Sequence, residues 1–111
     1  MAIYHPRHIK KVINLANIAD TDIPTIVSNN VSGPITKMRD ENVPKATLSI
    51  IVTNPPDSDV MTWYESEYEW QLYPMNMTDT DISNLASEVE SVLSGLKSRN
   101  VKECVLELLV T

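Results

Sequence analysis

The sequence predicts a small α+β domain, in which a mostly antiparallel sheet carries two helices packed on one face. Three observations lead to this fold class. Residues 78–99 have the spacing of an amphipathic helix, residues 46–53, 60–73 and 101–110 alternate in the manner of strands, and 111 residues is the size of one domain. The expected element order is helix, strand, strand, strand, helix, strand, and we expect residues 1–111 to form a single domain.

The first predicted helix spans about Pro6 to Ala19, with the proline in its first turn. Its apolar stripe has spacings of three, one and three residues and consists of Ile9, Val12, Ile13 and Ala16. A basic cluster stands at its start and consists of Arg7, His8, Lys10 and Lys11. Positive charge at that end opposes the helix dipole, so the cluster is not placed for helix stability. We interpret it either as a solvated face or as a contact patch.

Residues 20–45 give mixed local signals. Ile23–Ser28 has the β-branched content of a short strand, which Pro24 would restrict to an edge or a strand start. Asn29–Pro34 has the composition of a turn, and Ile35–Arg39 could form a second short strand. We therefore expect this segment to be either a hairpin or a partly ordered arm that docks on a partner.

Residues 46–53 and 60–73 predict an antiparallel pair of strands joined by the proline-rich loop 54–59. The second strand has an aromatic face that consists of Tyr64, Tyr68 and Trp70. Its other face is a row of glutamates with aromatic ends and consists of Trp63, Glu65, Glu67, Glu69 and Tyr73. This row is either a solvated acidic face or an acidic contact strip with aromatic anchors.

The C-terminal third predicts a helix followed by a strand. Thr78 is a suitable N-cap with Asp81 three residues later, and Asn100 is a natural left-handed stop. Gly95 inside the helix suggests a close backbone contact there. The single cysteine, Cys104, lies on the apolar face of the last strand, so we expect an inert core residue and no internal disulfide.

Charge is unevenly distributed along the chain. The net charge is −6, which argues against nucleic-acid binding, because a basic footprint is its first requirement. Residues 1–45 contain six Lys or Arg against four Asp or Glu, whereas residues 46–111 contain three against eleven. This polarity is either scatter in a small sample or a basic surface that meets an acidic surface on a neighbouring copy or another protein.

The sequence contains no pattern typical of catalysis or of cofactor binding. The two histidines, His5 and His8, stand near the N-terminus without a nucleophile elbow or further ligands, and two glycines are too few for a phosphate loop. We expect no catalytic, metal or cofactor site. A membrane span and a secretory signal are also not expected, and we expect a cytoplasmic location or, for a viral protein, the host cytoplasm or the virion.

These observations predict a protein that acts through other proteins. The candidate interface residues are Trp63, Glu65, Glu67, Glu69, Tyr73, Arg7, Lys10 and Lys11. The first hypothesis is a non-enzymatic assembly subunit that forms a homo-oligomer or part of a larger assembly. The second is an acidic inhibitor or adaptor that binds a basic surface, with its carboxylates spaced like nucleic-acid charge. A small enzyme or ligand-binding domain is the least favoured class.

The predicted order of a helix, a β-meander, a second helix and a final strand resembles that of small subunits that build rings or tubes in phage tails and connectors. This resemblance is at the level of the fold and includes no specific sequence motif. It implies a structural protein of a virus or phage particle that associates with copies of itself.

Overall fold

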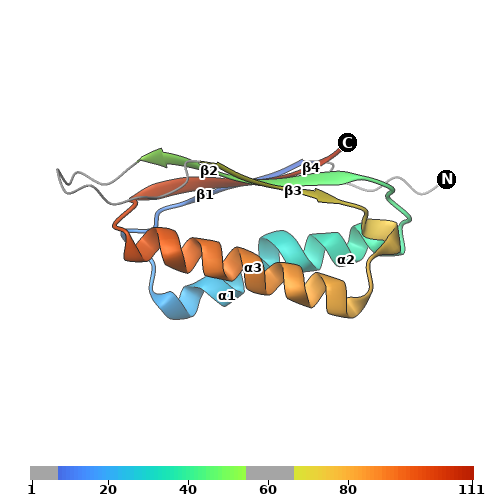
Figure 1. The fold of residues 1–111 in the computed structure, drawn as a ribbon, viewed down its shortest axis with the longest axis horizontal. Coiled ribbons are helices and arrows are strands. Elements are labelled where there is room, and N and C mark those ends of the chain that lie inside the picture. The colour runs from blue at the N-terminus through green and yellow to red at the C-terminus, as the bar shows by residue number, and fades with distance from the viewer. Residues whose placement is uncertain (1–7, 55–66) are drawn as a thin grey trace.

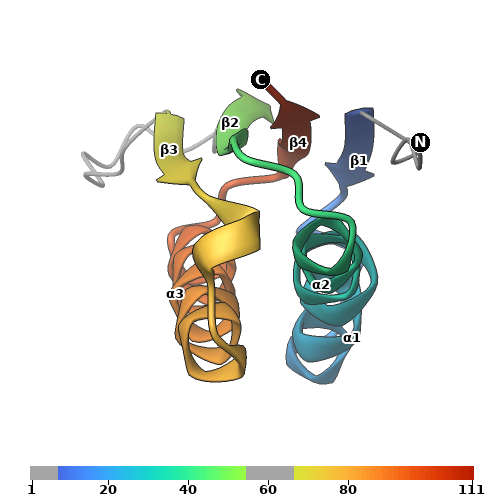
Figure 2. The ribbon, with the colours of Figure 1, turned by 90° about the vertical axis from the view of Figure 1, so that its right-hand side faces the viewer.

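The computed structural model describes residues 8–54 and 67–111, which form one four-stranded antiparallel sheet with helices on one face (Figures 1 and 2). This confirms the predicted fold class, a small α+β domain. The strands are β1 (His8–Ile13), β2 (Ala46–Asn54), β3 (Glu67–Leu72) and β4 (Glu103–Val110). The helices are α1 (Ile23–Val27), α2 (Gly33–Asp40) and α3 (Asp79–Ser98), with single turns η1 (Asp20–Asp22), η2 (Ser28–Ser32) and η3 (Pro74–Asn76).

The sheet has the strand order β1-β4-β2-β3, and every pair of neighbours is antiparallel. β1 and β2 therefore run in the same direction with β4 between them, and β3 and β4 do so with β2 between them. The chain thus forms two interlocked split β-α-β units. As a consequence β1 and β3 are the edge strands, and no described strand pairs with the outer side of either.

The helices between β1 and β2 form one nearly continuous rod, because α1, η2 and α2 follow one another without a break. Pro34 has no N–H, and its ring would clash with the carbonyl of the residue four positions earlier in a regular α-helix. The η2 segment is a π-helix, whose wider turn accommodates Pro34. The π-helical hydrogen bond runs from the backbone N–H of Gly33 to the carbonyl oxygen of Ser28, five residues earlier.

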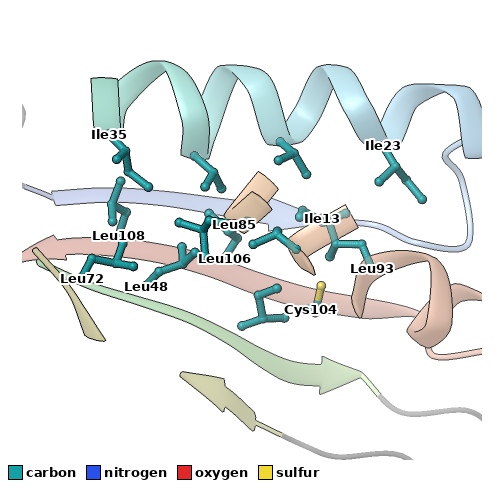
Figure 3. Close-up of a cluster of buried hydrophobic side chains, with 14 of the residues drawn as sticks. Ile13, Ile23, Ile35, Leu48, Leu72, Leu85, Leu93, Cys104, Leu106 and Leu108 are labelled. Carbon is teal, nitrogen blue, oxygen red and sulfur yellow. The ribbon is translucent and has the colours of Figure 1, made fainter. Parts of the chain in front are cut away.

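The core lies between the sheet and the helices (Figure 3). The central strands contribute side chains that are fully buried, namely Leu48, Ile50, Cys104, Leu106 and Leu108. The helices cover them with α1 and α2 over the β1 and β4 side and α3 over the β2 and β3 side (Figure 2). In the part of the chain that the structure describes, every buried residue is apolar. The described core therefore contains no buried polar or charged residue, and its one thiol is that of Cys104.

The helix predicted for residues 6–19 is wrong, because residues 8–13 form the edge strand β1. The apolar residues Ile9 and Ile13 satisfy a period of two as well as a period of four. Isoleucine and valine also favour the extended backbone. The chain therefore begins its described part with a strand and then a helix, so the helix-first order behind the resemblance to phage subunits is not the observed one.

The short strands predicted at residues 23–28 and 35–39 are also wrong, because both segments are helical, and so the hairpin alternative for residues 20–45 is not formed. A stripe of buried residues with helical spacing runs through the whole region and consists of Ile23, Val27, Val31, Ile35 and Met38. The sequence Gly33-Pro34 is typical of a turn, so it argued against a helix at this place. The π turn at η2 nevertheless lets the helix continue through the proline.

The remaining elements agree with the sequence. Thr78 and Asp81 form the predicted capping box at the start of α3, with the Asp81 N–H donating to the threonine Oγ1 at 3.1 Å. Asn100 has a φ of 65° and ends the helix. β2 and β4 follow the predicted ranges closely, and β3 occupies the second half of the predicted strand 60–73, whose first half lies outside the described residues. The close backbone contact expected at Gly95 is wrong for the described residues, because the nearest described neighbour of an added Cβ would be the Arg99 side chain of the same helix end.

Candidate interaction surface

The face of the sheet opposite the helices is not covered by any described element (Figure 2), and we call it the open face. The strand register aligns side chains across it in rows. One row is charged and consists of Lys10, Glu107, Ser49 and Glu69. The next row is mainly apolar and consists of Val12, Val105, Ile51 and Glu67. The open face therefore consists of a charged row and a mainly apolar row, each of which runs across all four strands.

Two of the three apolar side chains in this row are exposed, and the third, Val105, is half-buried between them. Val12 is 53% exposed and Ile51 is 39% exposed, and Leu109, which also lies on the open face, is 41% exposed. Exposed apolar residues that lie side by side are typical of contact surfaces. Sequence reasoning missed this row, because Val12 was assigned to a helical stripe. The signal was present in the mixed face of the last strand, where Val105 and Leu109 alternate with core residues.

The β1 edge carries two lysines on opposite sides of the strand. Lys10 lies on the open face opposite Glu107, and Lys11 points to the side of the helices opposite Leu106. The Glu107 carboxylate contacts the His8 ring instead, with 2.7 Å between its Oε2 and the His8 Nε2. Neither lysine forms an ion pair with a described residue. Both ammonium groups are exposed at this edge, so it is basic.

The β3 edge carries the opposite charge. Glu67 and Glu69 are exposed on the open face, and Glu69 accepts a hydrogen bond of 2.9 Å from the side chain of Gln71. Neither carboxylate has a cationic partner within the described residues. On the other side of the strand, the half-buried rings of Tyr68 and Trp70 stack with their centroids 6.4 Å apart. The edge therefore combines an aromatic pair with carboxylates that have no cationic partner among the described residues.

The structure thus places the candidate residues that it describes at the two opposite edges of one sheet. The basic pair lies on β1 and the acidic pair on β3, with β4 and β2 between them. Tyr73 follows β3 directly and is 53% exposed. The candidates Arg7, Trp63 and Glu65 lie outside the described residues. The described lysines of β1 and the described glutamates of β3 therefore lie on opposite edges and do not meet within one molecule.

A shallow recess accompanies the acidic edge on the helix side of the sheet. It lies between β3 and α3, has a volume of about 430 Å³, and is lined by Trp70, Ser87, Glu88, Ser91 and Val92. Glu88 is exposed and has no ion-pair partner among the described residues. Helical periodicity puts these serines and Glu88 on the polar side of α3, and the packing of α3 against the sheet brings them beside Trp70.

Other chemical groups in the described residues are few. No group of three or more His, Cys, Asp or Glu is arranged there to hold a metal ion. Cys104 is buried, and its pKa is raised to about 12 by burial and, to a smaller extent, by the charge of Glu103. In the same part of the chain, no helix has the length and apolar character needed to cross a membrane.

The chain matches no protein-family model, and no curated protein is detectably similar to it in sequence.

Proposed function

We propose that this protein is a non-enzymatic assembly subunit whose copies join head to tail through the edges of their sheets. One observation carries the proposal. Within the described residues, Lys10 and Lys11 on the edge strand β1 and Glu67 and Glu69 on the edge strand β3 have no oppositely charged partner. Edges of unlike charge attract each other, whereas two like edges repel. Because the contact is between different surfaces, it repeats from copy to copy and builds a ring or an open row.

The directions of the strands support this contact. Within one copy β1 and β2 run one way, and β3 and β4 run the other way. If a second copy is placed beside the first in the same orientation, its β1 is antiparallel to the β3 of the first. The joined sheet then continues with the same alternation, and each edge supplies the backbone partners that the other lacks.

The helical layer leaves room for this arrangement. Four strands at about 4.8 Å spacing span roughly 19 Å. Two helices at about 8–10 Å spacing span nearly the same width. Since the helices lie in two columns under the four strands (Figure 2), copies placed side by side keep both layers continuous. The helices of neighbouring copies therefore do not prevent the β3 edge of one copy from reaching the β1 edge of the next.

The two kinds of contact have different roles. Exposed lysine–glutamate pairs contribute only about 0–1 kcal/mol each, whereas each backbone hydrogen bond adds about 0.5–1.5 kcal/mol net. The ladder therefore supplies most of the affinity, and the charges select the β1–β3 contact over β1–β1 and β3–β3. Ring and tube assembly is what small subunits of phage tails and connectors do, and we extend the proposal to a subunit of such a particle on this mode of assembly alone, since the predicted helix-first order is not the observed one.

The solution mass tests this proposal directly. Light scattering after size exclusion should show assemblies at low salt whose mass falls as salt is added, because screening weakens the contacts between the charged edges. Lys10→Glu and Glu69→Lys should each shift the equilibrium towards monomers at low salt, and the double variant K10E/E69K should assemble again. The controls are Lys45→Glu and Glu41→Lys, which make the same charge changes at exposed residues outside the two edge strands.

Circular dichroism of each variant establishes that the fold is retained, since Lys10→Glu places two carboxylates opposite each other on β1 and β4. A wild-type protein that is monomeric at every salt and protein concentration contradicts the proposal. So does an assembly that both single reversals leave unchanged.

The second candidate function is that of an acidic adaptor that binds a basic protein surface. The observation in its favour is the exposure of Glu67 and Glu69 on the open face, where they are about 7 Å apart and have no cationic partner within the described residues. A monomeric protein that binds a lysine-rich peptide would support it. The variant E67K/E69K should then lose that binding, while E41K/E90K, with the same net charge, should retain it.

A further inference from the structure

We infer that the recess beside Trp70 is the receptor for the Lys11 side chain of the next copy, with Glu88 as the partner of its ammonium group. This inference rests on the proposed head-to-tail assembly and identifies the contact that makes it selective. When a strand is added to a sheet edge, backbone bonds give affinity and pockets for alternate side chains give specificity. The recess between β3 and α3 is a pocket of this kind.

The register of the joined sheet leads to this contact. Side chains of a strand alternate between the two faces, so open-face residues of β3 can only be opposite open-face residues of the incoming β1. Pairing Glu69 with the next copy's Lys10 satisfies this rule and places opposite charges together. It also places the next copy's Lys11 opposite Tyr68 and diagonal to Trp70, on the side where α3 lies.

The position of Lys11 is otherwise difficult to explain. It shares the helix-facing side of β1 with the core residues Ile9 and Ile13, yet it is exposed and without an ion pair among the described residues. A charge that points inward on an edge strand discourages indiscriminate pairing with other edges. An edge that accepts this strand must therefore offer a carboxylate on its own helix side. The β3 edge meets this requirement with Glu88.

The recess also suits the rest of the lysine side chain. Its apolar walls, Trp70 and Val92, match the four-carbon stem, and the Trp70 ring can attract the ammonium group through its π face. The hydroxyl groups of Ser87 and Ser91 can accept hydrogen bonds from that group. In the same register Ile9 of the incoming strand lies opposite Trp70, which covers the ring further.

A charge swap tests the inference. Lys11→Glu and Glu88→Lys should each raise the concentration at which the protein assembles roughly tenfold or more, and K11E/E88K should restore assembly. Glu90→Lys is the control, because it reverses a charge on the same helix at a residue that does not line the recess. Lys11→Gln removes the charge without adding a repulsive one, so it serves if K11E does not fold. The readout is the mass by light scattering over a dilution series at low salt.

The outcomes separate this inference from the proposed function. Weakened single variants with a restored double variant support the contact. An assembling wild type that Lys11→Gln and Glu88→Lys leave unchanged overturns the inference alone, as does a double swap that does not restore assembly. A monomeric wild type overturns both, whereas an assembly sensitive to Lys10 and Glu69 but not to Lys11 and Glu88 overturns only the recess.

Discussion

Cys104 shows how the core controls the chemistry of a side chain. Its thiol is fully buried, opposite Ile13 on one side and Val52 on the other. Burial raises its pKa to about 12, and the negative charge of Glu103 adds to this effect. Because the thiolate is the reactive form of cysteine, the folded protein should hold this residue unreactive at neutral pH.

The raised pKa of Cys104 predicts a loss of stability in alkali. The unfolded thiol ionises near pH 9, while the folded thiol stays protonated up to about pH 12. Between these values the unfolded state alone releases the proton. The free energy of unfolding of the wild type should therefore fall by about 1.4 kcal/mol per pH unit more steeply than that of Cys104→Ala. Urea unfolding curves at several pH values measure the difference, and equal slopes contradict it.

Gly33 is required by the backbone around it. A Cβ at this position would lie 2.9 Å from the carbonyl oxygen of Ser28, which is a backbone atom and cannot move aside alone. Although alanine favours helices, Gly33→Ala should lower the free energy of unfolding by about 1–3 kcal/mol, as overpacking does. Urea unfolding monitored by circular dichroism provides the measurement.

Gly95 is the matched control for that substitution. Here an added Cβ would meet only the Nη1 atom of Arg99 at 3.0 Å, which is the end of a long side chain that donates a hydrogen bond to the Gly95 carbonyl oxygen and can swing aside at the cost of that bond. Gly95→Ala should therefore stabilise the protein, by up to about 1 kcal/mol, through its helix propensity. If both glycines respond alike, the π turn at η2 is not the reason for Gly33.

α3 begins with a capping box whose two hydrogen bonds are both formed. The Asp81 N–H donates to the Thr78 side chain at 3.1 Å, and the Thr78 N–H donates to the Asp81 carboxylate at 2.9 Å. Thr78→Ala should lower the free energy of unfolding by about 1 kcal/mol. Thr80→Ala, one residue into the exposed first turn, should have little effect, and thermal unfolding of the two variants compares them. Equal losses would mean that the cap does not set the stability of this end.

The elements that the sequence predicted correctly are those in which one periodicity is long enough to exclude the other. α3 has twenty residues with a continuous stripe, and β2 and β4 alternate over eight or nine. β1 is short, so Ile9 and Ile13 fit a helix and a strand equally well. In the segment from α1 to α2 the buried residues keep helical spacing throughout. Pro34 lies among them and normally signals the end of a helix, and only the π turn of η2 makes it compatible with a continuing helix.

The candidate surface was predictable only in part for a related reason. Alternation along β3 put Glu67 and Glu69 on one face, and that face is the exposed one. The apolar row of the open face and the recess at Trp70 could not be found this way, because both join residues from different elements. Strand register and helix placement, rather than local pattern, bring those residues together.

The opposite charges of the two sheet edges predict that a minority of variant copies will stop growth. A Glu69→Lys copy keeps a normal β1 edge and can join the β3 edge of a wild-type copy, but its own β3 edge then repels the next lysine. Mixing a small fraction of this variant into wild-type protein should therefore lower the mean mass far more than its share of the molecules. Light scattering of mixtures at constant total concentration measures this effect.

The Glu41→Lys variant, mixed in the same proportions, should leave the mass unchanged. If Glu69→Lys lowers the mass only in proportion to its fraction, then the copies do not join in a directional row. A two-fold contact between like surfaces would be the better description in that case.

The apolar row of Val12, Val105 and Ile51 runs perpendicular to the strands. Copies that extend the sheet in the proposed way would also extend this apolar row. In the proposed assembly the small exposed patches of neighbouring copies would therefore form one continuous band, with Glu67 as a regular spacer between segments. In a closed ring such a band encircles either the bore or the rim. A second ring or an inner tube could bind this apolar band through many repeated contacts, each too weak to bind a single copy.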